Sequence, residues 1–213
     1  MTKRLCRIGL GILAAAVLAR AAEDPPDRII RNVEKKLEQT KTIRLEFLEE
    51  RIWKLTGETQ GLRGELVLEG ESRFRISTED QVIVSDGTTL WTYNLPTKQV
   101  LIDKLVNTKD ALLPRQILFQ YTRDYRVHGL AGESVLGIPC AVLVFTSETG
   151  DVFIPQVKVW VDKTEWIPRK IEQKDINEDL TVYTLENVRI GIPLDPSLFR
   201  FTPPKDADVI DMR

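Results

Sequence analysis

The sequence predicts a mainly β (α+β) protein, built on one long antiparallel sheet that is strongly curled or closed and carries helices on its concave face. Three observations predict it. Segments with alternating apolar and polar residues follow one another along most of the chain, turn signals separate them, and only two segments have helical character. A long antiparallel sheet must curl or close to remove its edges, and amphipathic helices can then bury their apolar faces on the concave side.

The N-terminus has the pattern of a cleaved secretory signal peptide. Basic residues precede the apolar run Ile8–Ala19, which is too short to span a bilayer comfortably, and a small-x-small cleavage site ends at Ala21. We therefore expect a signal peptide at residues 1–21 and a single domain at residues 22–213, with an uncleaved anchor as the alternative. Cleavage removes four basic residues and no acidic residue, so the net charge changes from −2 to −6. A chain with this charge should be soluble and should not adhere to anionic lipid head groups. The short apolar run, with no lipidation cysteine directly after it, predicts a soluble periplasmic monomer.

The first helix is predicted at residues 24–42, directly after the signal peptide. Pro25 and Pro26 suit its first turn. Apolar residues at helical spacing form one stripe, made of Ile29, Ile30, Val33 and Leu37. Because the opposite face is charged, this stripe must lie on an apolar surface.

Most of the remaining chain is predicted to be strand. The strands are expected within residues 42–50, 62–70, 73–77, 82–94, 99–105, 125–147, 156–175 and 180–191, about ten or eleven strands in all. Asp86-Gly87 supplies the turn of a hairpin, and consecutive hairpins of this kind make an antiparallel meander. Pro203-Pro204 should end regular structure near the C-terminus.

The meander is interrupted by a second helical segment at Asn107–Thr122. It has little β-branching, and Pro114 should shorten or kink it. Its broad apolar face consists of Leu112, Leu113, Ile117, Leu118 and Phe119. These residues are too many for an exposed insertion, so the segment should pack on the sheet or on a ligand.

The sequence contains no constellation typical of an enzyme. Its single histidine, His128, excludes motifs with two histidine ligands, and no P-loop, dinucleotide fingerprint or nucleophile elbow is present. Cys140 lies in an apolar run and is predicted to be a small buried hydrophobe. The basic residues form no block or stripe. We therefore expect no catalytic activity, no metal ion, no cofactor and no nucleic-acid partner.

One face of the sheet is expected to be strongly apolar. Trp91 and Tyr93 are two residues apart, so they share a face of their strand, and we expect that face to be the inner one. The full inward set is Leu45, Phe47, Leu66, Leu68, Phe74, Ile76, Ile83, Trp91 and Tyr93. Periodicity does not distinguish a packed core from a cavity, and both interpretations stay open on this evidence.

The predicted domain, from the first helix to the C-terminus, resembles the LolA family of periplasmic carriers of outer-membrane lipoproteins. The most specific segments are VIVSDGTTLWTYNLPTKQV at residues 82–100 and FRFTPPKDADVID at residues 199–211, and GELVLEGESRFRI at residues 64–76 matches in part. The resemblance implies an unclosed antiparallel β-barrel with a helical lid over an apolar cavity.

The resemblance also implies a function. A chaperone of this kind takes lipoproteins from an inner-membrane ABC transporter, shields their acyl chains, and passes them to an outer-membrane acceptor. The inward set would line the acyl-chain cavity, and the lid would present Ile30, Val33, Leu37, Leu112, Leu113, Ile117, Leu118 and Phe119. The alternative is a periplasmic lipid-binding sensor or regulator with the same half-barrel fold.

One motif departs from the family pattern. Between its second and third strands the family usually has Arg-Pro, whereas this chain has Gly70-Glu71. In the family that arginine helps to latch the lid to the barrel. Arg73 and Arg75 are the candidates to replace it here, although the motif does not place them at that position.

Overall fold

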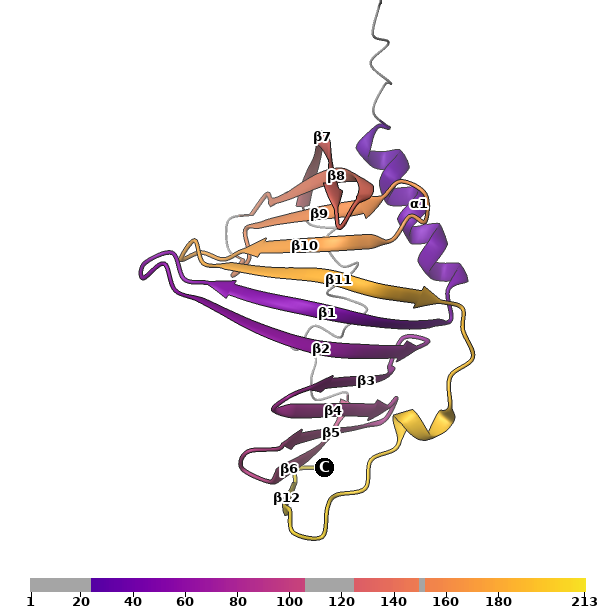
Figure 1. The fold of residues 1–213 in the computed structure, drawn as a ribbon, viewed down its shortest axis with the longest axis vertical. Coiled ribbons are helices and arrows are strands. Elements are labelled where there is room, and N and C mark those ends of the chain that lie inside the picture. Colours follow the sequence, from indigo (N-terminus) through magenta and orange to yellow (C-terminus); the bar gives the residue numbers. More distant parts are fainter. Residues whose placement is uncertain (1–23, 106–124, 150–151) are drawn as a thin grey trace, which may run out of the picture.

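A computed structural model describes residues 24–105, 125–149 and 152–213 of the chain (Figure 1). The expected signal peptide at residues 1–21 and the expected helical segment Asn107–Thr122 lie outside the described residues. In chain order, the elements are α1 (Pro26–Gln39), β1 (Thr42–Ile52), β2 (Thr59–Glu69), β3 (Arg73–Thr78), β4 (Gln81–Asp86), β5 (Thr89–Asn94), β6 (Gln99–Lys104), β7 (Tyr125–Val135), β8 (Ile138–Ser147), β9 (Gln156–Asp162), β10 (Pro168–Lys174), β11 (Leu180–Ile190), the 3-10 helix η3 (Pro196–Phe199) and β12 (Asp208–Asp211).

These strands form one curled sheet of twelve strands, in the order β12-β6-β5-β4-β3-β2-β1-β11-β10-β9-β8-β7. The end strands β12 and β7 do not pair with each other, so the sheet is unclosed (Figure 1). This confirms the predicted fold class. The additional strand is β12, which pairs in parallel with the edge strand β6, after Pro203-Pro204. The prediction that regular structure ends at the two prolines is therefore wrong, because a partner strand distant in sequence orders the residues that follow them.

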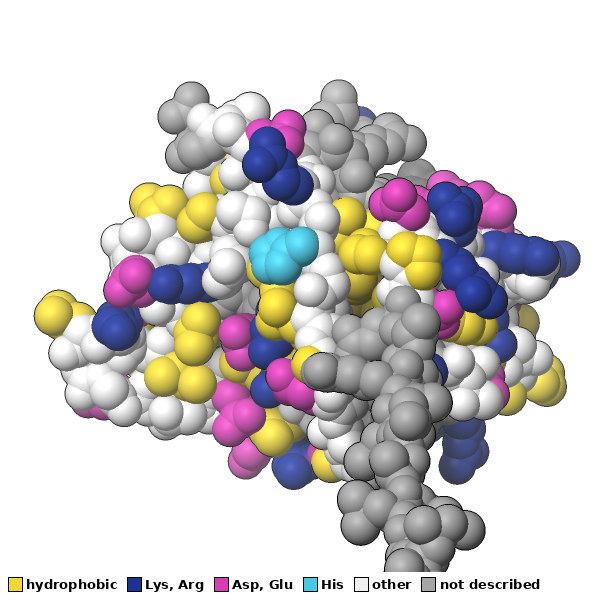
Figure 2. Space-filling model, turned by 90° about the horizontal axis from the view of Figure 1, so that it is seen from above, with side chains coloured by type: hydrophobic (Ala, Val, Ile, Leu, Met, Phe, Trp, Pro, Cys, Tyr) yellow, Lys and Arg dark blue, Asp and Glu magenta, His cyan; other side chains and the backbone are white. Residues whose placement is uncertain are grey.

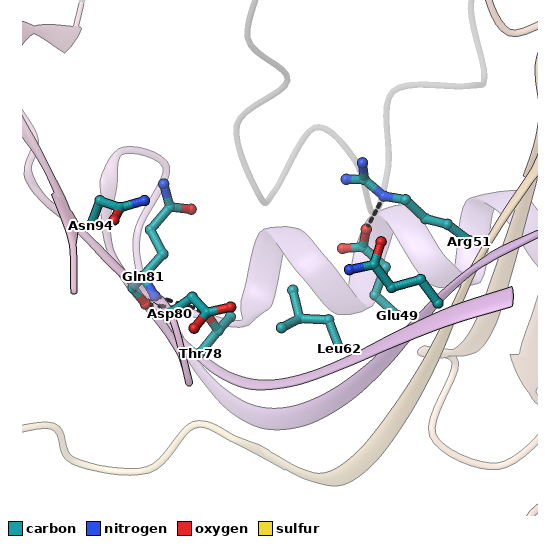
Figure 3. Close-up of a pocket in the computed structure, with 8 residues that line it drawn as sticks. Glu49, Arg51, Leu62, Thr78, Asp80, Gln81 and Asn94 are labelled. Carbon is teal, nitrogen blue, oxygen red and sulfur yellow. Dashed lines mark hydrogen bonds and ion pairs between the residues drawn. The ribbon is translucent and has the colours of Figure 1, made fainter. Parts of the chain in front are cut away.

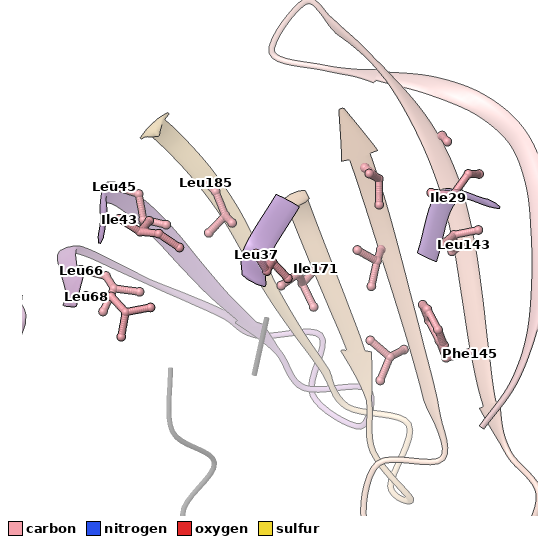
Figure 4. Packing of buried hydrophobic residues seen from close by; sticks show 14 of the residues in the cluster. Ile29, Leu37, Ile43, Leu45, Leu66, Leu68, Leu143, Phe145, Ile171 and Leu185 are labelled. Atoms are coloured by element: carbon pink, nitrogen blue, oxygen red, sulfur yellow. The ribbon is translucent and has the colours of Figure 1, made fainter. Parts of the chain in front are cut away.

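Helix α1 lies across the concave face of the sheet. Pro26 occupies its first turn, where a missing N–H has no cost, and Ile29 and Leu37 are its buried residues. Figure 4 shows Leu37 beside Ile171 of β10 and Ile29 beside Leu143 of β8. The apolar stripe predicted for the first helix therefore packs on the half of the sheet formed by β8 to β10.

The C-terminal segment covers the opposite, convex face of β3 to β6. Asp195 caps η3 by accepting a hydrogen bond from the Ser197 N–H, and η3 lies against β3 and β4. Phe199 is 1% exposed, and the Arg73 guanidinium lies over its ring at 4.7 Å. The segment therefore acts as a second layer on the outside of the sheet.

A smaller apolar cluster lies on the convex face of the other half of the sheet, around Trp160. Its other buried members are Val135, Cys140 and Val142. The indole Nε1–H of Trp160 donates a hydrogen bond of 2.7 Å to Glu133. Cys140 is 1% exposed, and burial raises the pKa of its thiol. This confirms the prediction that Cys140 is a small buried hydrophobe.

The turn between β9 and β10 is held by a buried ion pair. Asp162 accepts hydrogen bonds from Arg169 Nη2 at 2.7 Å and from the backbone N–H groups of Thr164 and Glu165. The side chain of Asp162 is 4% exposed and that of Arg169 is 13% exposed. Burial opposes ionisation of Asp162, but these hydrogen bonds outweigh it and hold the pKa of the carboxyl below its ordinary value of 3.8.

We expect Asp162→Ala to lower the free energy of unfolding by about 3 kcal/mol at pH 7, because Arg169 then stays buried without its partner. The pKa of Asp162 is lower in the folded protein than in the unfolded chain. The contribution of its carboxylate to the free energy of unfolding is therefore complete above a pH of about 4 and is lost as the pH falls through the folded-state pKa. Urea unfolding should therefore show a smaller difference between wild type and variant near pH 3. Asp206→Ala, which breaks the exposed pair with Lys98, is the control and should leave stability unchanged. An Asp162→Ala protein as stable as wild type at pH 7 would contradict this account.

Candidate functional site

The concave face of the sheet is the candidate functional site, and its strand register can be followed across five strands. Residues that pair directly in a sheet point to the same face. Leu45 of β1 pairs with Leu66 of β2, which pairs with Ile76 of β3, which in turn pairs with Ile83 of β4. We call the apolar residues that this register brings together the apolar floor; they are Ile43, Leu45, Phe47, Leu66, Leu68, Phe74, Ile76, Ile83 and Leu185.

Most of the predicted inward set therefore lies on the concave face, but Trp91 and Tyr93 do not. They share a strand face, as predicted, yet the residue opposite Ile83 is Thr92, so both rings point to the convex side. There Trp91 pairs with Val84, and the Tyr93 ring lies 5.9 Å from that of Phe201. The prediction that these two rings line the inner wall is wrong, because the C-terminal segment supplies an apolar layer outside the sheet.

Burial varies across the apolar floor and is lower toward β4. Leu68 is fully buried and Phe74 is 3% exposed, whereas Ile76 and Ile83 are only partly buried. Ile30, Val33 and Leu37 of α1 pack against the same cluster. The other predicted lid residues, Leu112, Leu113, Ile117, Leu118 and Phe119, lie outside the described residues.

The concave face changes from apolar to polar along several strands at the same end of the sheet. In β1, the inward residues Leu45 and Phe47 are followed by Glu49 and Arg51. We call the polar residues at this end the polar rim; they are Glu49, Arg51, Gln60, Thr78, Gln81, Asn94, Gln173 and Thr181. Arg51 pairs in register with Gln60 on one side and with Thr181 on the other, so the rim crosses several strands.

Two pockets open at the polar rim, and Arg51 lines both. One, of about 290 Å³, lies over β1 to β5, and Figure 3 shows Leu62, Gln81 and Asn94 around it. The other, of about 360 Å³, lies over β1, β10 and β11 and is lined by Trp53, Ile154 and Tyr183 among others. These volumes are near the lower end of the range for small-molecule sites.

Arg51 forms an ion pair with Glu49, which lines the pocket over β1 to β5. Arg51 Nε donates a hydrogen bond of 2.7 Å to Glu49, whose side chain is only 12% exposed (Figure 3). This hydrogen bond and the negative charge of Glu49 raise the pKa of Arg51. Burial, with a further contribution from Glu49, raises the pKa of Tyr183 to about 12, so the tyrosine stays neutral at physiological pH.

The two arginines considered as replacements for the family's latch residue lie on the convex face. Arg73 forms an ion pair with Glu69 and stacks on Phe199, and Arg75 donates a hydrogen bond to Ser77. Neither side chain therefore faces α1. Among the rim residues, Arg51 is the basic residue on the concave side.

No group of three or more side chains that could hold a metal ion occurs in the described part of the chain. His128 is exposed on β7, and the single histidine is visible in cyan on the surface in Figure 2. Within the same described residues, no helix is long and apolar enough to cross a membrane. The concave face thus has an apolar region and, at one end, a polar region.

The polar rim was not among the features predicted from the sequence. The alternation of β1 does indicate it, because Glu49 and Arg51 lie on the same strand face as Leu45 and Phe47. In β2, Gly64 pairs with Phe47, and a Cβ at Gly64 would lie 2.5 Å from Cζ of the Phe47 ring. The absence of a side chain at Gly64 lets the Phe47 ring lie across β2 at the edge of the apolar floor.

Comparisons with known proteins agree with this geometry. Residues 38–202 match the family model described as outer membrane lipoprotein carrier protein LolA. An outer-membrane lipoprotein carrier protein of Methylococcus capsulatus is 26% identical over 200 residues, which cover 91% of each chain. An uncharacterized protein of Methanocaldococcus jannaschii is 23% identical over 86% of this chain, which spans only 53% of that relative's length. A solved structure of an uncharacterized conserved protein from Thermus thermophilus has a TM-score of 0.58 at 14% identity, covering 87% of this chain and 98% of that one.

Proposed function

The chain belongs to the LolA family, and we propose that it carries lipoproteins by shielding their acyl chains on the concave face of the sheet. The observation that carries this proposal is the apolar floor, which is continuous across β1 to β4 and is only partly buried at Ile76 and Ile83. The name of the Methylococcus capsulatus relative, an outer-membrane lipoprotein carrier protein, supports lipoprotein as the cargo.

Physical chemistry explains why such a cargo needs a carrier. Each methylene group exposed to water costs about 0.8 kcal/mol, so a few acyl chains of roughly fifteen methylenes each cost on the order of tens of kcal/mol to move through water bare. A carrier must cover this surface and still release it. A surface that is loosely packed over part of its area meets both needs better than a fully packed core does.

The proposed setting is the periplasm. The protein would be exported by the signal peptide expected at residues 1–21 and would act there as a monomer. It would receive cargo from an inner-membrane ABC transporter and deliver it to an outer-membrane acceptor. In this role the protein acts by binding and not by catalysis.

We expect the secreted chain to bind a synthetic diacylated lipopeptide with a fluorescent acyl label in a saturable manner. At a free lipopeptide concentration about 100 times the Kd, binding should raise the free energy of unfolding by about 2.7 kcal/mol. Fluorescence titration and urea unfolding measure the two effects. A chain that binds no acylated ligand would contradict the proposal, and binding without transfer of the lipopeptide to outer-membrane vesicles would favour a sensor over a carrier.

A further inference from the structure

We infer that the concave face orients its cargo, with an uncharged polar head at the polar rim and the acyl chains on the apolar floor, and that the rim excludes anionic phospholipid heads. This inference rests on the proposed function. The head it fits is the amide and ester linkage of an acylated peptide.

The first support is the direction of the polarity change. In β1, β2 and β3 the residues on the concave face become polar toward the same end, at Glu49, Gln60 and Thr78. Beyond them, Gln81 and Asn94 are paired across β4 and β5. An amphiphile that lay in the opposite direction would place its polar head on the apolar floor and would leave its hydrogen-bonding groups without partners.

The second support is the kind of polar group at the rim. Amide and hydroxyl side chains predominate, and these both donate and accept hydrogen bonds, as peptide amides and esters require. Among the described residues that line the two pockets, the only basic side chain is Arg51, and its charge is already matched by Glu49. Neutral hydrogen-bonding heads therefore fit the rim better than phosphate does.

The third support is the charge around the two pockets. Their described lining residues include four acidic side chains, Glu49, Asp80, Asp175 and Asp179, against the single guanidinium of Arg51. Within this lining the acidic side chains outnumber the basic one by three, and two of them, Asp175 and Asp179, also accept hydrogen bonds from backbone N–H groups. An anionic lipid would be repelled there, whereas an uncharged lipopeptide linkage would not. Such selection matters for a carrier that meets membranes, because phospholipids share the acyl chains of the cargo and differ in the head.

The test compares two ligands with the same chain and different heads, 1-myristoyl-glycerol and 1-myristoyl-lysophosphatidylglycerol, below their micellar concentrations. Each competes with the fluorescent lipopeptide for the wild-type chain. The neutral ligand is expected to bind at least tenfold more tightly. Glu49→Gln keeps a hydrogen-bond acceptor for Arg51 but removes the negative charge, so it should bring the two affinities within about threefold of each other.

Glu65→Gln is the matched control. Glu65 forms a comparable pair with Arg44, at 2.6 Å, between β1 and β2 but on the convex face. This variant should keep the wild-type preference. If the wild type binds both heads equally, or if Glu65→Gln changes the preference as much as Glu49→Gln does, the inference is overturned while acyl-chain binding itself stands.

Orientation is tested by tryptophan quenching. Trp53 lines the pocket over β10 and β11 at the rim end. A neutral acylglycerol brominated near its head should quench Trp53 more than one brominated at the chain end, and Trp53→Phe should remove this difference. The reverse order of quenching would overturn the proposed orientation. If the chain binds the fluorescent lipopeptide but neither brominated ligand, this inference is overturned while the proposed function stands. If it binds none of the three, the proposed function fails and this inference fails with it.

Discussion

Replacing Ile83 by glutamate is expected to lower the affinity for the acylated lipopeptide at least tenfold. Ile83 lies in the apolar floor, in register with Ile76, and is only partly buried, so the carboxylate would meet the acyl chains directly. Burying a charge against hydrocarbon without a partner costs several kcal/mol. Fluorescence titration measures the affinity, and urea unfolding shows how much stability the variant retains.

Val82→Glu is the matched control for this variant. Val82 is the adjacent residue of β4, has the same intermediate exposure, and points to the convex face opposite Tyr93. Its replacement should cost comparable stability and leave the affinity within about twofold of wild type. Equal loss of binding in the two variants would mean that binding depends on the integrity of β4 and not on the concave face.

Phe199→Ala is expected to have the largest effect on stability, a loss of about 4 kcal/mol in the free energy of unfolding. The ring is 1% exposed and lies between the C-terminal segment and the convex face, where the Arg73 guanidinium stacks on it. Its removal leaves a cavity that the short helix η3 can fill only in part. Urea unfolding monitored by circular dichroism measures the loss.

The control for Phe199 is Phe153, which is 64% exposed. Phe153→Ala should change the free energy of unfolding by less than about 1 kcal/mol. A small effect at Phe199 would show that the C-terminal segment adds little to the stability of the sheet. In that case the convex position of Trp91 and Tyr93 would need another cause.

The fold class could be predicted from the sequence because alternation and turn signals are local properties. Which face of each strand points to the concave side was less predictable. Alternation fixes which residues of one strand share a face, and Trp91 and Tyr93 do share one. It does not fix which face points inward once the chain has passed a turn, and here Thr92 takes the inward position beside Ile83.

Two further features depend on contacts between distant segments. β12 forms because its four residues pair with the edge of β6, a partner that the local sequence after Pro203-Pro204 does not reveal. The polar rim forms because strand register brings Arg51 beside Gln60 and Thr181, which are far apart in the chain. The polar residues were visible in the sequence, but their position at one end of the concave face follows only from the register.

Photo-cross-linking gives the most direct test of where the acyl chains lie. Benzoylphenylalanine is placed at Ile76 on the concave face or at the adjacent Ser77 on the convex face, both partly buried residues of β3. Each protein is loaded with a lipopeptide that is radiolabelled in its acyl chains, and then irradiated. A strong cross-link from position 76 and little or none from position 77 is the expected result. Equal cross-linking from both positions, or cross-linking from position 77 alone, would contradict the central claim that the concave face shields the acyl chains.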